Sequence, residues 1–191
     1  MGTSRQSKKP PILLKQSILL IGTVGVRKSA LAEAVAGHLG LQAFDPEEAL
    51  RQRQKARLNE LEALHGLPWL RTKLLDLILP VIESQPNSIV PCPAILASHP
   101  DFQSLVQEAS STILLESLPL TNYTHVVARE SHHTEDLWTS DAKIFFYHRY
   151  WMKHRQKLKG KFHVRVQGEL DADSQAICQK ILAIQELEPA R

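Results

Sequence analysis

The sequence predicts an α/β fold of three layers, in which a parallel sheet of about five strands lies between two sets of helices. Two observations support this fold class. Short apolar runs alternate along the chain with longer stretches that repeat apolar residues at helical spacing, which is typical of doubly wound domains. The first apolar run, residues 17–21, leads through a glycine-containing loop directly into an expected helix, as in parallel strand–helix units.

The individual elements follow from apolar periodicity and from the positions of glycine and proline. Expected strands cover residues 17–21, 42–44, 88–91, 112–115 and 162–166. Expected helices cover residues 28–39, 47–64, 69–82, 100–109, 141–157 and 171–184. Gly40 is suited to end the first helix, and Gly-Leu-Pro at residues 66–68 is suited to separate the second helix from the third. Residues 118–128 carry no clear pattern.

The chain has 191 residues, of which 43% are hydrophobic, and this suits one globular domain with a substantial core. We expect residues 1–15 to form a flexible basic arm and residues 16–191 to form a single domain. No apolar stretch is long enough to cross a bilayer, and the two cysteines provide no disulfide framework. These features predict a reducing intracellular location, cytoplasmic or nuclear, without a membrane partner. A net charge of +3 and the lack of a recognisable motif argue against direct nucleic-acid binding.

Residues 22–29 read Gly-Thr-Val-Gly-Val-Arg-Lys-Ser and match the phosphate-loop pattern G-x-x-x-x-G-K-[ST] at every required position except one. Arg27 replaces the second required glycine. In such a loop, backbone N–H groups surround the phosphates, the lysine reaches the terminal phosphates and the hydroxyl binds Mg²⁺. Ser29 is therefore a candidate Mg²⁺ ligand. The nucleotide-binding candidates are Gly22, Gly25, Lys28 and Ser29.

Arg27 leaves two interpretations of this loop open. The first is ordinary nucleotide binding. The second is a vestigial or weakened loop, because a left-handed backbone at Arg27 would cost roughly 1 kcal/mol or more. In addition, the Arg27 side chain could occupy the phosphate pocket as an internal cation.

Asp45 and Glu47 follow the second expected strand and have two possible roles. Carboxylates two residues apart at the end of a strand can point into a ligand cleft, with Asp45 toward Mg²⁺ and Glu47 toward a hydroxylated substrate. Alternatively, Asp45 caps the following helix, with Pro46 as the first helical residue and Glu47 in the first turn. Capping alone would explain both residues.

Several motifs, taken in order, resemble the shikimate kinase family over about residues 17–186. They lie at residues 19–29, 39–41 (Leu-Gly-Leu), 44–47 (Phe-Asp-Pro-Glu), 65–71 (His-Gly-Leu-Pro-Trp-Leu-Arg) and 148–151 (His-Arg-Tyr-Trp). The resemblance implies the three-layer fold of nucleoside monophosphate kinases. It also implies that Arg71 and Arg149 bind the carboxylate of a small ring acid, with Glu47 near its hydroxyl groups. The alternative is that both arginines are surface residues of amphipathic helices.

The chain also departs from the family pattern. The glycine turn after the third strand falls on Cys92-Pro93-Ala94, where proline lacks a donor and side chains prevent a close backbone approach. Glu47 replaces a shorter aspartate, and the arginine of the lid has no convincing equivalent, Arg129 being a weak candidate. Together with Arg27, these departures predict a slow or inactive kinase. No catalytic residue is assigned, and Lys28 and Asp45 are regarded as vestigial.

We therefore expect a degenerate shikimate-kinase-like domain that is not an enzyme and serves in ligand sensing or protein interaction. It resembles the kinase-like domain shared by the fungal quinate repressor and the pentafunctional aromatic-biosynthesis polypeptide. That resemblance implies a link to quinate and shikimate metabolism and to its transcriptional repression. The expected partners are a ring carboxylate from these pathways, and a regulatory protein or further domains of a longer chain. No cofactor is expected.

The alternative is an active ATP-dependent shikimate kinase that transfers a phosphoryl group to a hydroxyl of a small ring carboxylic acid. Lys28, Ser29 and Asp45 would then hold ATP and Mg²⁺. A third possibility is an interaction domain whose cleft is empty. His132 and His133 do not suggest a metal site, because no cysteine or matching carboxylate pattern accompanies them.

Overall fold

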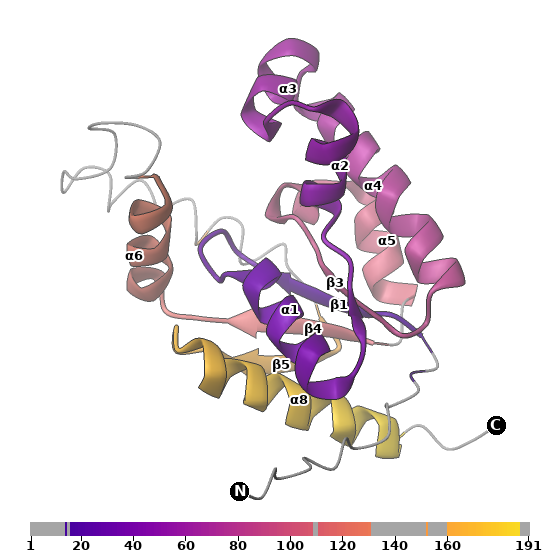
Figure 1. Ribbon diagram of the computed structural model, residues 1–191, viewed down its shortest axis with the longest axis vertical. Helices are drawn as coiled ribbons and strands as arrows, with labels where there is room; N and C mark the ends of the chain where they lie inside the picture. Colours follow the sequence, from indigo (N-terminus) through magenta and orange to yellow (C-terminus); the bar gives the residue numbers. More distant parts are fainter. Residues whose placement is uncertain (1–13, 15, 109–110, 131–151, 153–159, 188–191) are drawn as a thin grey trace, which may run out of the picture.

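The computed structural model describes residue 14 and residues 16–108, 111–130, 152 and 160–187. These residues form a three-layer α/β structure around a five-stranded sheet (Figure 1). All strand pairs are parallel, and the strand order is β2-β3-β1-β4-β5. The strands are β1 (Ile18–Gly22), β2 (Gln42–Ala43), β3 (Ser88–Pro91), β4 (Thr112–Glu116) and β5 (Phe162–Arg165). The predicted fold class is confirmed.

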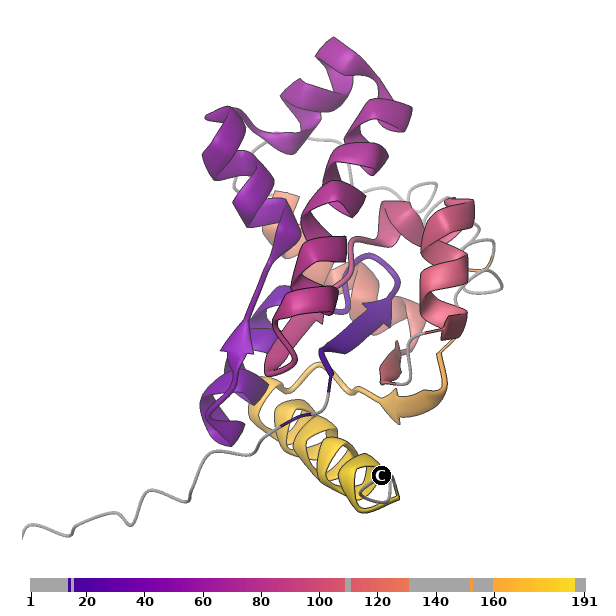
Figure 2. The ribbon, with the colours of Figure 1, turned by 90° about the vertical axis from the view of Figure 1, so that its right-hand side faces the viewer.

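Helices cover both faces of this sheet (Figures 1 and 2). They are α1 (Lys28–Leu39), α2 (Pro46–Gln54), α3 (Leu58–His65), α4 (Leu67–Ser84), the 3₁₀ helix η1 (Ala94–Ser98), α5 (Pro100–Glu108), α6 (Pro119–Glu130) and α8 (Leu170–Leu187). One buried cluster joins α1 and α8 to the sheet, and a second joins α4, η1 and α5 to the opposite face. No helix within the described ranges is both long and apolar enough to cross a membrane.

Strand β1 is apolar throughout because it is covered on both faces. All five of its residues are buried. Ile18 and Leu20 belong to the cluster beneath α1 and α8, whereas Leu19 and Ile21 belong to the cluster beneath α4 and α5. A strand in this position needs no alternation of polar and apolar residues. Since β1 lies between β3 and β4, the loop that follows it opens near the middle of one sheet edge.

The structure corrects the expected helix over residues 47–64, which is divided into α2 and α3. Lys55 ends α2 in a left-handed conformation with φ of 52°. The Arg57 N–H then donates to the Glu60 carboxylate over 2.8 Å at the start of α3. Apolar periodicity alone does not reveal such a turn, because it indicates which side of a helix is buried and not where the helix ends.

Two further expectations concern the carboxyl-terminal half and the amino-terminal arm. Residues 118–128, which carry no clear pattern, lie largely within α6, and the helix expected over residues 141–157 lies outside the described residues.

Leu14, in the expected amino-terminal arm, is buried, and its N–H donates to Asn87 Oδ1 over 2.7 Å. The rest of the expected arm also lies outside the description, so its flexibility stays a prediction.

Helix α4 offers a matched test of the core, because two of its leucines differ only in burial. Leu74 is 0% exposed and Leu79 is 40% exposed. We expect Leu74→Ala to lower the free energy of unfolding by about 2–5 kcal/mol, since it leaves a cavity between α4 and the sheet. Leu79→Ala should change it by less than about 0.5 kcal/mol. Urea unfolding of both variants measures these values, and similar losses would contradict the described packing.

Candidate functional site

The candidate site is the loop between β1 and α1, which lies at the carboxyl end of the central strands. In parallel α/β sheets, ligands bind at this edge. The structure brings the four nucleotide-binding candidates together here, since they lie at the end of β1, in this loop or in the first turn of α1. Their role in binding stays a prediction. These candidates are Gly22, Gly25, Lys28 and Ser29.

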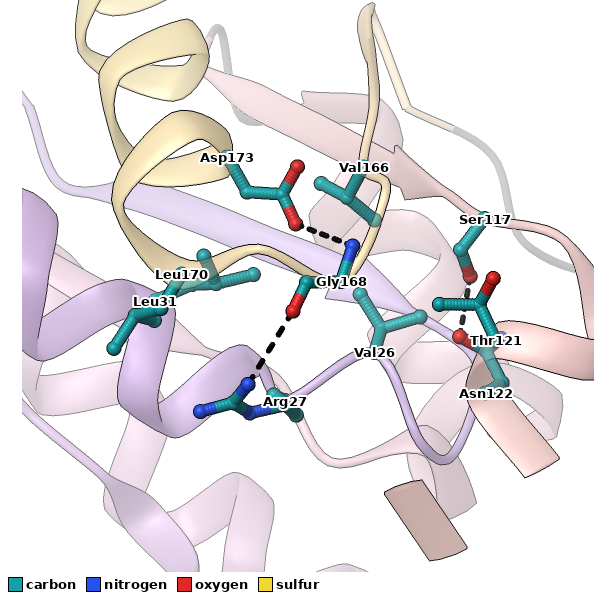
Figure 3. Close-up of a pocket in the computed structure, with 10 residues that line it drawn as sticks. All are labelled: Val26, Arg27, Leu31, Ser117, Thr121, Asn122, Val166, Gly168, Leu170 and Asp173. Carbon is teal, nitrogen blue, oxygen red and sulfur yellow. Dashed lines mark hydrogen bonds between the residues drawn. The ribbon is translucent and has the colours of Figure 1, made fainter. Parts of the chain in front are cut away.

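Arg27 occupies the loop in the conformation that a glycine would favour. It is the N-cap of α1, with φ of 59° and ψ of 38°, in the left-handed region. The turn therefore keeps the backbone path of a glycine, at a cost of roughly 1–2 kcal/mol. The Arg27 side chain extends toward the connection between β5 and α8, where Nη1 donates to Gly168 O over 3.4 Å (Figure 3). The guanidinium thus lies against that connection and not over the loop.

Lys28 is held by the loop itself. Its ammonium donates to Gly22 O over 3.0 Å and to Thr23 O over 3.2 Å. The loop carbonyls therefore take the place that phosphate oxygens would take on a lysine in this position. An incoming anion would have to exchange these bonds for its own.

A pocket beside the loop was not predicted from the sequence. Its lining combines apolar side chains from the phosphate loop, α1 and the segment that leads from β5 into α8 with polar side chains that follow β4 or belong to α6 and α8 (Figure 3). The lining residues are Val26, Arg27, Leu31, Ser117, Thr121, Asn122, Val166, Gly168, Leu170 and Asp173. The pocket lies next to the phosphate loop, and its free volume of about 10 Å³ is roughly that of one water molecule.

Asp173 fixes the wall of this pocket. Its side chain is 5% exposed, and its carboxylate accepts hydrogen bonds from the N–H groups of Gln167 and Gly168, each over 2.8 Å. These bonds hold the turn in which Gly168 has φ of 99°. The Gly168 carbonyl is thereby set in place to accept from Arg27. The sequence signal was a glycine followed by acidic residues at the start of a helix, which also fits ordinary capping.

Asp45 and Glu47 lie after β2, two strands away from β1 in the sheet. The Asp45 carboxylate accepts from the N–H groups of Glu47 and Glu48 over 2.9 and 3.2 Å. Asp45 is thus the N-cap of α2, as one of the two predicted roles required. A metal role for Asp45 and a substrate role for Glu47 stay predictions. Within the described ranges, no three His, Cys, Asp or Glu side chains form a potential metal site.

Arg71 lies on α4 and is bonded to η1. Its Nε donates to Ile95 O over 2.8 Å, and its Nη2 donates to Ser98 Oγ over 2.9 Å. Arg71 therefore joins α4 to the segment after β3, and its remaining N–H donors are the ones left for a carboxylate. His132, His133 and Arg149 lie outside the described residues. The expectation that Arg149 and Arg71 bind the same carboxylate therefore stays a prediction.

Cys92 and Pro93 follow β3, where the resemblance placed a glycine turn. The Cys92 N–H donates to Leu20 O over 2.8 Å, so this residue continues the sheet. Its side chain is 1% exposed. Burial raises the pKa of the Cys92 thiol from 9.0 to about 12, and the positive charge of Lys28 opposes this shift only in part. A protonated thiol thus stands near Lys28 at the carboxyl end of β3.

Comparison with known proteins supports the resemblance to shikimate kinases. A shikimate kinase from Francisella philomiragia is 24% identical over 102 residues, which is 53% of this chain and 58% of that protein. No protein-family model matches the chain. The solved shikimate kinase from Bacteroides thetaiotaomicron is 18% identical with a TM-score of 0.73, covering 90% of this chain and 98% of its own.

Two further solved structures have the same fold. A shikimate kinase from Acinetobacter baumannii in complex with shikimate has a TM-score of 0.71 at 16% identity, covering 88% of this chain and 93% of its own. A gluconokinase from Sinorhizobium meliloti has a TM-score of 0.60 at 17% identity, covering 92% and 96%. The chain therefore has the fold of these phosphate-loop kinases. The narrower link to the fungal quinate repressor stays a prediction.

Two substitutions separate the hydrogen bonds that Asp45 accepts as the N-cap of α2 from the effect of its negative charge. We expect Asp45→Ala to lower the free energy of unfolding by about 1 kcal/mol, because two N–H groups of α2 lose their acceptor. Asp45→Asn keeps an acceptor oxygen at the cap and should change it by only a few tenths of a kcal/mol. Urea unfolding of both variants at neutral pH gives the comparison. Equal losses would show that the carboxylate charge, and not the cap, stabilises the protein.

The Cys92 thiol predicts a loss of stability in alkali. Below pH 9 the thiol is protonated in both states, whereas between pH 9 and about 12 it ionises only in the unfolded chain. The free energy of unfolding should therefore fall as pH rises through this range, by about 1 kcal/mol between pH 8 and 10. Cys92→Ala should lack this component, and Cys178 is present in both proteins. Parallel pH profiles in urea unfolding would contradict the prediction.

Proposed function

We propose that this chain is a shikimate-kinase-like domain that binds a small ring carboxylic acid and transfers phosphate slowly or not at all. The observation that carries the proposal is the position of Arg27. Its guanidinium borders the pocket beside the phosphate loop and is bonded to Gly168. A nucleoside attached to phosphates in the loop would have to displace this side chain. The loop keeps its backbone path, but the adjoining pocket, with Arg27 in its wall, has room for about one water molecule.

Binding of the ring acid is proposed to depend on Arg71, Glu47 and Arg149. Arg71 already has a fixed orientation through η1, so its remaining donors are preorganised for a carboxylate. The similar Acinetobacter protein was solved in complex with shikimate, which makes shikimate and the related quinate the first ligands to test. In this proposal, ligand binding alters contact with a regulatory protein that represses quinate metabolism.

An active ATP-dependent kinase is the second candidate. The left-handed conformation of Arg27 favours it, because the loop retains the turn that surrounds phosphate. Lys28 and Ser29 stand at the start of α1, as in a working phosphate loop. ATP and Mg²⁺ would then be held by these residues together with Asp45. The ammonium would offset phosphate charge, and the Ser29 hydroxyl would bind the metal ion.

Calorimetric titration and a turnover assay separate these functions. We expect shikimate or quinate to bind the wild-type protein, and ATP·Mg²⁺ to bind it weakly. We also expect ADP production with either acid to be slow or undetectable. Turnover at an ordinary kinase rate, in the range of about 1–100 per second, would overturn the proposal in favour of an active kinase. Binding of neither acid would overturn its ligand-sensing part.

Arg27→Gly tests the block directly. We expect this variant to bind ATP·Mg²⁺ about tenfold or more tightly than the wild-type protein, because the guanidinium no longer borders the pocket. Lys55→Gly is the matched control, since Lys55 has φ of 52° and lies at the end of α2. It relieves similar backbone strain away from the loop and should leave the affinity unchanged. Equal affinity of Arg27→Gly and wild type would show that Arg27 is not the obstacle.

A further inference from the structure

Asn122 in the first turn of α6 is a polar side chain that is fully buried beside the phosphate loop. It is 0% exposed. Burial of an amide is costly unless its groups are hydrogen-bonded, and both ends of this one are bonded. Nδ2 donates to Thr23 Oγ1 over 2.9 Å, and Oδ1 accepts from the hydroxyl of Ser117 at the end of β4 (Figure 3). The amide therefore joins the phosphate loop to α6 and to the short connection before it, and Thr23 is 99 positions away from Asn122 in the chain.

Thr23 connects this amide to Lys28. The Thr23 side chain is 5% exposed and accepts from Asn122, while its backbone oxygen accepts from the Lys28 ammonium over 3.2 Å. One residue thus holds Asn122 on one side and the lysine of the loop on the other. The position of one of the two Lys28 acceptors, Thr23 O, is therefore linked to where α6 places Asn122.

The backbone of the loop also touches α6 directly. Gly25 has φ of 90°, and a Cβ atom at this position would lie 2.4 Å from Asn122 O. Such a distance is far below van der Waals contact, so only glycine allows the loop and helix to approach this closely. Figures 1 and 2 both show the loop beside the start of α6. Gly25, predicted as a phosphate-binding glycine, thus has a packing role that does not involve a ligand.

We propose that Asn122 is a positioning residue of the phosphate loop, which ties Thr23, and through it one of the two acceptors of Lys28, to helix α6. The loop and the first turn of α6 then open and close as one unit. A ligand that pulls Lys28 away from Thr23 alters the same unit and therefore changes the local stability of the first turn of α6. This functional meaning rests on the proposed ligand-binding function, whereas the coupling itself is a property of the ligand-free protein.

Hydrogen exchange of the ligand-free protein tests the coupling. Thr23→Val matches the size of threonine but removes the acceptor of Asn122 Nδ2, whereas Thr23→Ser keeps a hydroxyl. We expect Thr23→Val to raise amide exchange about three- to tenfold in residues 22–29 and also in residues 119–124. Thr23→Ser should restore the wild-type pattern in both segments. Thr124→Val, in the same helix, removes only the local bond to Thr121 O and should leave the loop unchanged.

Two results would overturn the inference. In the first, faster exchange in Thr23→Val is confined to residues 22–29, which means that α6 does not follow the loop. In the second, exchange rises equally in all elements, including α8, which means that the bond contributes only to global stability. In either case Asn122 is an ordinary buried amide and not a positioning residue.

Added nucleotide separates this inference from the proposed function. ATP·Mg²⁺ is added to Arg27→Gly and to the double variant Thr23→Val/Arg27→Gly. We expect slower exchange in both the loop and residues 119–124 of the first protein, but only in the loop of the second. Protection limited to the loop in both proteins overturns the coupling. Absence of protection in both proteins counts against Arg27 as the obstacle to nucleotide, and the ligand-free comparison still decides the role of Asn122.

Discussion

The parallel pairing of β1 with β3 and β4 is the constraint on which the rest of the structure depends. It requires β1 to be buried on both faces, and it brings the carboxyl ends of neighbouring strands to one edge of the sheet. Residues that follow four different strands therefore meet there: the loop after β1, Cys92 after β3, Ser117 after β4 and Gly168 after β5. The candidate site is a result of this topology.

The groups that would bind a ligand at this edge are engaged with the protein itself. The Lys28 ammonium is bonded to loop carbonyls, Arg27 to Gly168, Arg71 to η1, and Asp45 to the start of α2. A ligand that binds Lys28 must replace such bonds, whereas Arg71 has further donors, and each exchange has a small net value of about 1 kcal/mol. A ligand with one charged group therefore gains little, while a ligand with several groups at fixed positions can gain enough to bind. If the proposed function holds, we expect the site to prefer rigid molecules with several functional groups.

Much of the fold could be predicted from the sequence, and less of the site. The buried strands and α1 follow from apolar runs and from Gly40, whose φ of 69° ends the helix as expected. The division of α2 from α3 depends on one left-handed lysine, which leaves no mark in the apolar pattern. The sequence predicts the energetic cost of a left-handed backbone at Arg27. The direction of the Arg27 side chain, however, depends on Gly168, 141 positions away in the chain. Contacts of that range arise from tertiary packing, and no local pattern encodes them.

The buried thiol of Cys92 has a consequence for the chemistry of the protein in the cell. Oxidants and electrophiles attack the thiolate form and require access to the sulfur atom. Cys92 is 1% exposed, and burial holds its pKa at about 12, so both requirements fail at neutral pH. We therefore expect peroxide to leave the Cys92 sulfur unoxidised while the protein is folded.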